Sequence, residues 1–313
     1  MITFKDVVKR YGDKVAVDHL TMEIKSGEVV MLVGPSGCGK TTTLKMINRL
    51  IEPTEGVIAI DDVDTRGVPI TELRRSIGYV IQQVGLFPHL SVGENVATVM
   101  RLRGWDRART KARVEELLDL VGLPAAEYAK RLPEELSGGQ RQRVGVARAL
   151  GVDPNMLLMD EPFGAIDPVT RDRLQDELLR LQTVVRKTIV FVTHDIDEAI
   201  KLGDRVALFT PDGRIAQYDT PAAILAHPAS DYVEGFLGAG RLVRRLGLIP
   251  LRGLQLERDV RVRPAVEIDI EGTLRDALDG ILRSDDGYVA VTDGGEVVGL
   301  LDAEAIRQAA TVA

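Results

Sequence analysis

Short hydrophobic runs recur along the first two thirds of the chain, and segments with apolar residues at helical spacing separate them. A run without polar positions is typical of a strand that is buried on both faces, as in a parallel sheet. Strand and helix patterns in alternation indicate an α/β fold with a largely parallel sheet. The runs occupy residues 29–33, 77–81, 155–159 and 188–193.

The remaining patterns predict further elements around these strands. Residues 2–24 alternate between apolar and polar positions with a break at 11–14, which predicts two strands. A strand at 57–60 ends in a turn of Asp61 and Asp62. Helical spacing predicts helices over residues 42–50, 94–121, 141–150 and 169–185.

A glycine-rich segment joins the first hydrophobic run to the first helix and fits the pattern G-x-x-x-x-G-K-[ST]. Glycines let backbone N–H groups converge on phosphate oxygens, and the helix N-terminus adds a partial positive charge. A chance glycine-rich turn is the alternative, but the strand before it and the helix after it favour a phosphate loop. We expect a nucleoside triphosphate to bind residues Gly34, Pro35, Ser36, Gly37, Cys38, Gly39, Lys40, Thr41 and Thr42. Within this loop, the Lys40 amine is expected to reach the β- and γ-phosphates and the Thr41 hydroxyl to bind Mg²⁺.

Polar residues follow the other hydrophobic runs. Gln82 can reach a metal-bound water. Asp160 is expected to hold Mg²⁺ through water, and Glu161 to orient or deprotonate the attacking water. His194 ends a parallel strand and would hydrogen-bond the γ-phosphate. The alternatives are that the carboxylates cap the next helix and that the histidine is structural.

Two further features suggest contact with a nucleotide. Ser137, Gly138, Gly139 and Gln140 open a helix and predict a second anion site, although Ser-Gly-Gly alone is common in linkers. Tyr11 lies upstream of the phosphate loop, where its ring either stacks on the purine or is a half-buried hairpin residue.

Composition narrows the classes of function. The chain has 313 residues and a formal net charge of −7, which argues against a nucleic-acid partner. The single cysteine, Cys38, excludes an intrachain disulfide and is a small filler or an oxidation-sensitive thiol. The beginning of the chain lacks the apolar core of a signal peptide, and no apolar run is long enough to cross a bilayer. We therefore expect another chain to carry out any membrane function.

These motifs occur in the order typical of an ATP-binding-cassette (ABC) ATPase, and the resemblance covers residues 2–237. It implies a RecA-like core, a helical subdomain at about 88–152, and two copies associated head to tail around ATP. Ser137 and Gly139 of one copy would contact the γ-phosphate that Lys40 of the other copy holds, and Asp167 would cross the dimer seam. By the same resemblance Asp160 supports Mg²⁺, Glu161 is the catalytic carboxylate and His194 is the γ-phosphate switch. Gln82 would link the nucleotide state to a membrane partner.

Residues 46–56 and 73–89 more narrowly resemble importer cassettes for glycine betaine, choline, carnitine or proline. The resemblance implies permease subunits, a substrate-binding protein and a location on the cytoplasmic face of the membrane, and the exposed-loop candidate at 85–92 is suited to the permease. A cassette for another solute, such as an amino acid or a polyamine, is the alternative. A non-transport ABC ATPase is a second alternative, but it predicts a long coiled coil or two cassettes in one chain, and this sequence has neither. A third alternative is a regulatory nucleotide sensor with incidental ATPase activity, and the presence of Glu161 and His194 argues against it.

A composition change near residue 240 predicts a linker at 238–258 and a small α+β domain at 259–313. The β-α-β-β-α pattern of the small domain resembles one cystathionine-β-synthase (CBS) motif, expected to pair with its counterpart in a second copy. Asp302 and Ala305 depart from the usual adenosyl-binding pattern, which leaves a cyclic dinucleotide or no nucleotide. Arginines in and after the linker either touch anionic lipid or are solvated. They are Arg241, Arg244, Arg245, Arg252, Arg258, Arg261 and Arg263.

Overall fold

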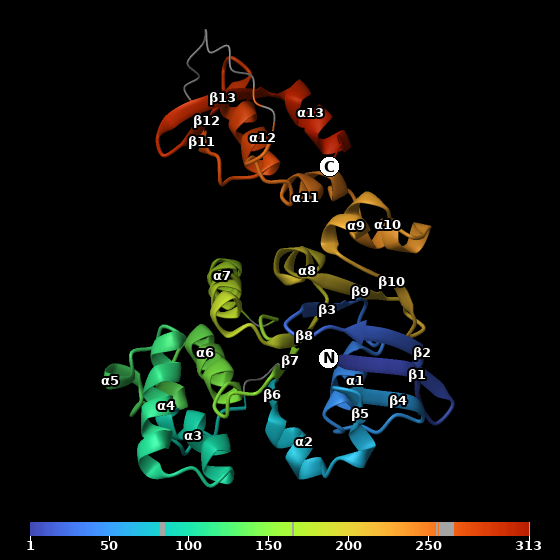
Figure 1. Ribbon diagram of the computed structural model, residues 1–313, viewed down its shortest axis with the longest axis vertical. Helices are drawn as coiled ribbons and strands as arrows, with labels where there is room; N and C mark the ends of the chain where they lie inside the picture. The colour runs from blue at the N-terminus through green and yellow to red at the C-terminus, as the bar shows by residue number, and fades with distance from the viewer. Residues whose placement is uncertain (82–84, 165, 255, 257–265, 313) are drawn as a thin grey trace. The chain divides into compact units, whose positions relative to one another are not determined.

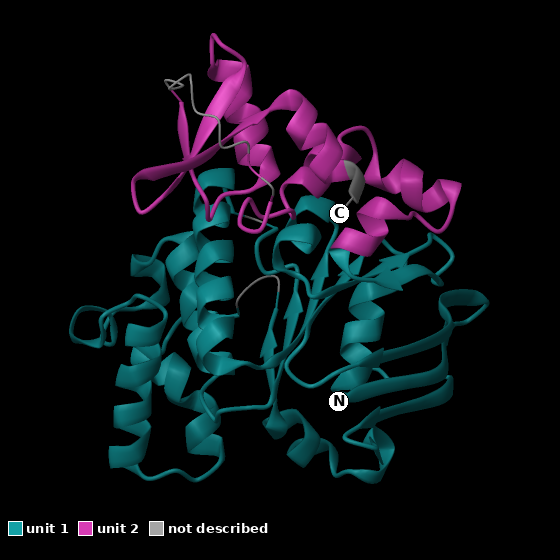
Figure 2. Cartoon of the chain, turned by 45° about the horizontal axis from the view of Figure 1, so that its top comes forward, with its two compact units in different colours: residues 1–221 teal, residues 222–313 magenta. Residues whose placement is uncertain are grey.

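The computed structural model describes residues 1–81, 85–164, 166–254, 256 and 266–312. Two compact units make up the chain, Met1–Pro221 and Ala222–Ala313 (Figure 2). The boundary expected between residues 237 and 238 lies inside the second unit.

A six-stranded sheet forms the centre of the first unit (Figure 1). Its strand order is β10-β9-β3-β8-β7-β6, and all neighbours are parallel except β10 and β9. Every residue of β3, β7 and β8 is buried, which confirms three of the four hydrophobic runs as fully buried strands, whereas the fourth run forms β6 at the edge of the sheet. The strands are β3 (Val29–Val33), β6 (Ile77–Val80), β7 (Met156–Asp160), β8 (Thr188–Thr193), β9 (Arg205–Phe209) and β10 (Ile215–Asp219).

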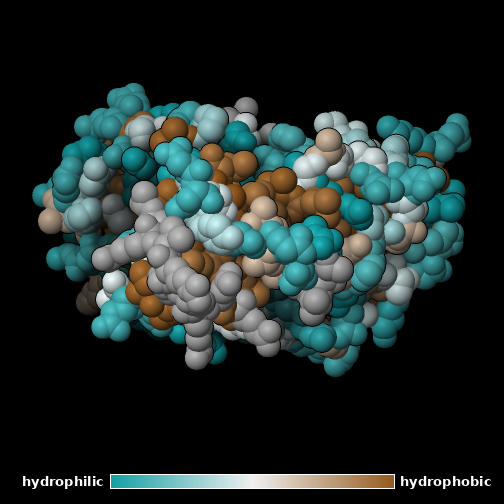
Figure 3. All heavy atoms as spheres, turned by 90° about the horizontal axis from the view of Figure 1, so that it is seen from above, coloured by the Kyte–Doolittle hydropathy of each residue, from teal (hydrophilic) through white to brown (hydrophobic). Residues whose placement is uncertain are grey.

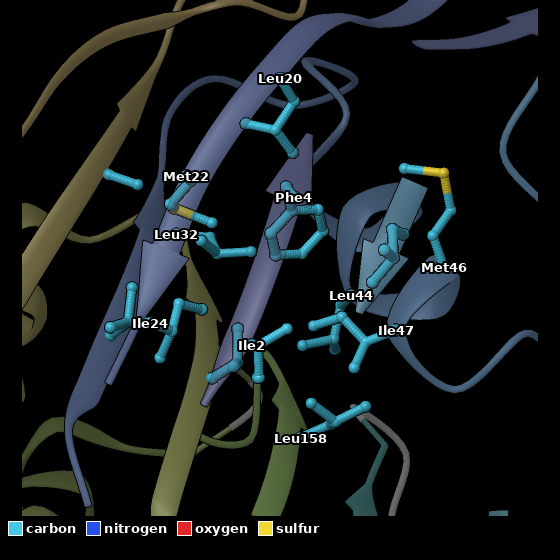
Figure 4. Close-up of a cluster of buried hydrophobic side chains, with 14 of the residues drawn as sticks. Ile2, Phe4, Leu20, Met22, Ile24, Leu32, Leu44, Met46, Ile47 and Leu158 are labelled. Atoms are coloured by element: carbon cyan, nitrogen blue, oxygen red, sulfur yellow. The ribbon is translucent and has the colours of Figure 1, made fainter. Parts of the chain in front are cut away.

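A second, antiparallel sheet of order β2-β1-β4-β5 packs its apolar side toward the first helix. Figure 4 shows Ile2 and Phe4 of this sheet facing Leu44 and Ile47 of α1 (Lys40–Ile47). All four side chains are fully buried, so this core fixes the helix that follows the phosphate loop. The strands are β1 (Ile2–Tyr11), β2 (Lys14–Ile24), β4 (Glu55–Ile60) and β5 (Val63–Asp64).

The helices of the first unit correct one sequence prediction. The segment 94–121 is not one continuous helix, because α3 (Val92–Leu102) ends before Gly104, which has a φ of 72°. The next helix, α4 (Arg107–Leu120), is capped by Asp106, whose side chain accepts a hydrogen bond from the backbone N–H of Arg109. The others are α2 (Ile70–Ser76), α5 (Ala125–Tyr128), α6 (Gly138–Ala149), α7 (Pro168–Val185) and α8 (Ile196–Leu202).

The second unit has the predicted β-α-β-β-α order in β11, α12, β12, β13 and α13. The strand β11 is parallel to β12, which forms an antiparallel hairpin with β13. Leu246 and Leu251, from the segment expected to be a linker, are buried in the core of this unit. The elements are α9 (Pro221–Ala226), which begins at the last residue of the first unit, α10 (Asp231–Leu237), α11 (Arg241–Leu246), β11 (Glu267–Asp269), α12 (Leu274–Arg283), β12 (Tyr288–Asp293), β13 (Glu296–Asp302) and α13 (Ala303–Val312).

Within the described residues, no helix combines the length and the apolar character that crossing a membrane requires. The face seen in Figure 3 is largely hydrophilic, with hydrophobic residues gathered in patches between the polar ones.

A candidate nucleotide-binding site

The register of the central sheet brings three of the predicted segments to one edge. Val33 of β3 pairs with Thr193 of β8, so the phosphate loop and His194 leave the sheet at the same level. Asp160 of β7 pairs with Val192 of β8, which places Glu161 one residue beyond at that edge. Because the carboxyl ends of parallel strands form the ligand crevice of such sheets, these residues surround one site.

Two glycines of the phosphate loop have backbone geometry that other residues rarely adopt. Gly34 has a φ of 151°, and a Cβ atom there would lie 2.8 Å from the Phe209 carbonyl oxygen. Gly39 has a φ of 97°, and its Cβ would lie 2.2 Å from the Ala16 carbonyl oxygen. Larger residues at these positions would displace the backbone of neighbouring strands, so the loop conformation depends on both glycines.

Lys40 is buried at the start of α1 and folds back over the loop. Its Nζ donates hydrogen bonds to the carbonyl oxygens of Gly34, at 2.7 Å, and Pro35, at 2.8 Å. The Nζ also lies 3.8 Å from the Cys38 Sγ. Burial raises the pKa of the Cys38 thiol, so Cys38 is a protonated packing residue at neutral pH.

Thr41 and Asp160 meet although 119 residues separate them in the chain. The Thr41 hydroxyl donates a hydrogen bond of 2.8 Å to Asp160 Oδ1. Burial raises the pKa of the Asp160 carboxyl, while the Thr41 hydrogen bond lowers it. A hydroxyl and a carboxylate are the hard oxygen ligands that Mg²⁺ prefers, so this pair fits the expected metal.

Glu161 leaves the end of β7 with a φ of 43°, in the left-handed region that is unusual for a residue with a side chain. Its backbone N–H donates a hydrogen bond of 3.0 Å to the Val192 carbonyl oxygen, which holds this conformation. The His194 Nδ1 lies 3.4 Å from Glu161 Oε2. The His194 side chain is 59% exposed and the Glu161 side chain 23%, so the imidazole faces solvent above a largely covered carboxylate.

The predicted second anion site is the beginning of α6. The Ser137 Oγ accepts a hydrogen bond from the Gln140 backbone N–H, and Gln140 Oε1 accepts one from the Ser137 N–H. This reciprocal pair is a capping box, and it leaves Ser137 and Gly138 exposed. Gln140 Nε2 also donates to the Tyr128 hydroxyl, which fastens the box to the end of α5.

The beginnings of α6 and α7 lie against each other. A Cβ on Gly139 would lie 3.0 Å from the Thr170 Cγ2, so a larger residue would press on the first turn of α7. The Thr170 backbone N–H donates to Asp167, which caps α7 and whose pKa this hydrogen bond lowers. Ser137, Gly139 and Asp167 thus form a second cluster, and no hydrogen bond or ion pair joins it to the phosphate loop within the described part of the chain.

The remaining predicted residues are Tyr11 and Gln82. Tyr11 ends β1 and is 48% exposed, with the Lys9 Nζ 5.1 Å from its ring centroid. Its ring is therefore available for stacking. Gln82 lies outside the described residues.

Sequence reasoning missed residues that connect the elements of the site. Arg171 donates to the Ile166 carbonyl oxygen and lies 3.6 Å from the Asp195 carboxylate, so it links the turn before α7 to the residue after His194. The Tyr79 hydroxyl is buried, and burial together with the charge of Asp160 raises its pKa to about 12. No local pattern marks these residues, because the Asp195 carboxylate near Arg171 and the Asp160 charge near Tyr79 are distant from them in the sequence.

A phosphate loop after a central parallel strand, with two carboxylates at a nearby strand end, defines a P-loop nucleoside triphosphatase. Comparison with known proteins refines this class. A family model described as ABC transporter matches residues 17–164. The chain is 49% identical over 308 residues to the carnitine transport ATP-binding protein OpuCA of Listeria monocytogenes serotype 1/2a (strain 10403S), a match that covers 98% of this chain and 76% of the relative. The chain belongs to the ATP-binding proteins of ABC transporters.

Two further comparisons agree with this family. The glycine betaine uptake system ATP-binding protein YehX of Escherichia coli (strain K12) is 48% identical over 280 residues, which are 89% of each chain. Among solved structures, a dimeric post-hydrolysis state of the ATP-binding cassette MJ0796 bound to ADP and Pi matches with a TM-score of 0.63 at 35% identity. That match covers 71% of this chain and 99% of the other. The chain is accordingly an ABC-type ATPase that binds ATP.

Proposed function

We propose that this chain is the ATP-hydrolysing subunit of an importer that takes up a quaternary-ammonium osmoprotectant through a separate permease. Relatives named for carnitine and glycine betaine transport, which are 49% and 48% identical to this chain over the aligned residues, support the substrate class. The observation that carries the ATPase role is the group of Lys40, Thr41, Asp160, Glu161 and His194 at one sheet edge.

Binding of ATP would use the phosphate loop and the beginning of α1. Lys40 would exchange its hydrogen bonds with the Gly34 and Pro35 carbonyl oxygens for phosphate oxygens, since an ammonium group prefers an anionic acceptor. The Tyr11 ring would stack on the base. Mg²⁺, when bound, would neutralise developing phosphate charge, and the Thr41 hydroxyl, the Asp160 carboxylate and Gln82 are the residues that would hold it.

Hydrolysis would depend on Glu161 and His194. The Glu161 carboxylate would orient the attacking water and accept its proton, which is the role of a general base. His194 would hold the γ-phosphate by a hydrogen bond, and its distance of 3.4 Å from Glu161 Oε2 keeps the two groups in one site. Glu161 has a left-handed backbone conformation at the end of β7, and its carboxylate lies beside His194.

A second copy of the chain would complete the site. Ser137 and Asp167 are exposed on either side of the buried Gly139, and a partner in head-to-tail arrangement would present this cluster to the nucleotide held by Lys40. A dimeric relative of similar fold supports this arrangement.

The permease would contact the segment around residues 82–90, at the cytoplasmic face of the membrane. Phe87 in this segment is 42% exposed, and Pro88 and His89 beside it are also exposed. Closure of the two copies on ATP would pull on the permease through this segment, and hydrolysis would reset it. A substrate-binding protein would deliver the solute on the opposite side.

The second unit would be regulatory, in keeping with the expected arrangement of an ABC cassette followed by a linker and a small CBS-like domain. A single CBS-type motif would pair with its counterpart in the second copy, and its ligand would be a cyclic dinucleotide if it has one. The exposed Leu242 and the arginines of α11 support a weaker proposal, contact with anionic lipid. Vesicle binding that responds to neither salt nor lipid charge would remove that proposal.

Uptake of labelled glycine betaine by cells shifted to high salt tests the transport function. We expect Glu161→Gln to bind ATP, trap the dimer and lower ATP turnover at least about 100-fold, because general bases contribute rate factors of that size. Salt-stimulated uptake should disappear in the same variant. Glu115→Gln, which removes an exposed carboxylate of α4, is the control.

Excess unlabelled choline, carnitine and proline would then rank the solutes. Uptake that persists in Glu161→Gln cells, with expression and redundant importers checked, would contradict the substrate assignment. Undiminished ATP hydrolysis by the purified variant would contradict the role of Glu161.

A further inference from the structure

The loop at residues 85–91 exposes its side chains while its backbone is firmly held. Phe87, Pro88 and His89 face solvent, and the loop leads from the end of β6 to the first turn of α3. An exposed loop usually hydrogen-bonds its backbone to water, so two side chains that bind this backbone from other elements need an explanation.

Asn95 is one of these side chains. It is fully buried in the first turn of α3. Its Oδ1 accepts a hydrogen bond of 2.7 Å from the Phe87 backbone N–H. Its Nδ2 lies within hydrogen-bonding distance of three carbonyl oxygens, those of Phe87 at 3.1 Å, Leu90 at 3.0 Å and Ser91 at 3.0 Å. Only an amide side chain offers an acceptor and two donors in this space.

Arg148 is the second side chain. It lies in the last turn of α6 and donates a hydrogen bond of 2.8 Å from Nη1 to the Gly85 carbonyl oxygen. The same helix begins at the capping box of Ser137. One end of α6 therefore lies at the proposed nucleotide contact, and the other end holds the loop that is proposed to contact the permease. The helices α3 and α6 pack against each other, as Figure 1 shows in green. The backbone of the loop is therefore hydrogen-bonded by side chains from both α3 and α6, which pack against each other.

We propose that Asn95 and Arg148 are positioning residues that fix the 85–91 loop to α3 and α6. A displacement of α6 at its nucleotide-contacting end would then move the exposed Phe87 with it. The hydrogen bonds described above run from both residues to the 85–91 loop. This inference rests on the proposed transport function, because the loop needs a permease to act upon. Their loss should separate ATP hydrolysis from transport instead of stopping hydrolysis.

Hydrogen exchange on the purified full-length chain tests the grip itself. Asn95→Asp keeps the side-chain shape but places a carboxylate opposite three carbonyl oxygens. We expect the Phe87 amide to exchange at least about 10-fold faster in this variant, because its protecting acceptor is displaced. Thr98→Ala is the matched control, since it removes a hydrogen bond from α3 to the Glu94 carbonyl oxygen that does not reach the loop.

Transport measurements test the consequence. In Asn95→Asp and in Arg148→Met we expect ATP hydrolysis by the purified chain to stay within about twofold, while uptake of labelled glycine betaine falls about 10-fold. Arg148→Lys, which keeps a donor and the charge, should recover part of the uptake. Arg148→Met gives an independent test if Asn95→Asp does not fold, as judged by its thermal transition.

Each other outcome counts against a specific claim. Unchanged Phe87 exchange in Asn95→Asp, or uptake and hydrolysis that fall in parallel in both variants, would overturn the inference. Uptake equal to wild type in both variants would do the same. Wild-type cells without salt-stimulated uptake would overturn the proposed function on which the inference rests, whatever the exchange rates.

Discussion

Asp160 shows how a single residue can serve the site at a cost in stability. Asp160 is 9% exposed, and burial raises the pKa of its carboxyl group even though Thr41 donates a hydrogen bond to it. A buried carboxylate is disfavoured unless other groups compensate its charge. The Asp160 carboxylate therefore lies where it could hold a metal ion, although without the ion its charge lowers the stability of the folded chain.

The pH dependence of stability should report this cost. Below the ordinary pKa of 3.8, both the folded and the unfolded chain carry the proton. As the pH rises, the unfolded chain ionises first, so the contribution of Asp160 to stability falls until the pH passes the raised pKa of the folded state. Asp160→Asn removes this loss, and we expect its Tm to exceed that of wild type by about 2–4 °C at pH 7, equivalent to about 1 kcal/mol.

Calorimetry from pH 4 to pH 8 without Mg²⁺ would measure the difference between the two Tm values. That difference should grow with pH and then level off. Asp172→Asn, at an exposed carboxylate on α7, should show no such growth. A difference that is constant or that shrinks with rising pH would contradict the assignment.

At the scale of elements, α3 and α6 begin with the same local device. Ser91 accepts from the Glu94 N–H and Ser137 from the Gln140 N–H, each within a reciprocal capping box. The same hydrogen bond is therefore present at two helices, only one of which is assigned to the nucleotide.

Substitution of Ser91 and of Ser137 can distinguish a loss of stability from a loss of ATP turnover. Ser91→Ala and Ser137→Ala should each lower the free energy of unfolding by about 1 kcal/mol, because both lose an N-cap. Only Ser137→Ala should also lower ATP turnover by the purified chain, since its hydroxyl would contact the γ-phosphate held by a second copy. Chemical denaturation and a phosphate-release assay measure the two effects, and equal turnover in both variants would remove Ser137 from the site.

The hydrophobic pattern predicted three of the central strands but missed the break between two helices. Hydrophobic runs predicted β3, β7 and β8 because a strand buried on both faces leaves no polar positions. The interruption between α3 and α4 was missed because apolar spacing continued through it. Gly104, with its φ of 72°, and the N-cap Asp106 were the local signals that could have shown the break.

At the scale of the whole molecule, the two clusters of site residues belong to one catalytic event only if two copies associate. Lys40 and Ser137 would then act on the same ATP from different chains. In a symmetric pair each copy gives its phosphate loop to one site and its capping box to the other.

A mixing experiment tests this arrangement. Lys40→Ala and Ser137→Arg should each abolish ATP turnover alone. An equal mixture should regain up to about a quarter of wild-type turnover, because half of the random pairs are mixed and one of their two sites is intact. A mixture as inactive as its parts, with association verified by light scattering, would count against sites shared between copies.

The amino-acid sequence by itself determined the features that depend on near neighbours. The phosphate loop, the capping boxes and the buried strands are local, since a few adjacent residues set their backbone conformation or burial. The order of these motifs was enough to indicate the family and the residues of the candidate site.

Tertiary structure decided which distant residues meet. Thr41 reaches Asp160 across 119 residues, and Arg148 reaches Gly85 across 63, because sheet register and helix packing bring them together. No local pattern encodes such pairs, since a hydrogen bond between distant segments depends on the geometry of two surfaces that meet only in the folded chain. For this reason the sequence revealed the chemical groups of the site, whereas the grip of Asn95 and Arg148 on the exposed loop was visible only in the folded chain.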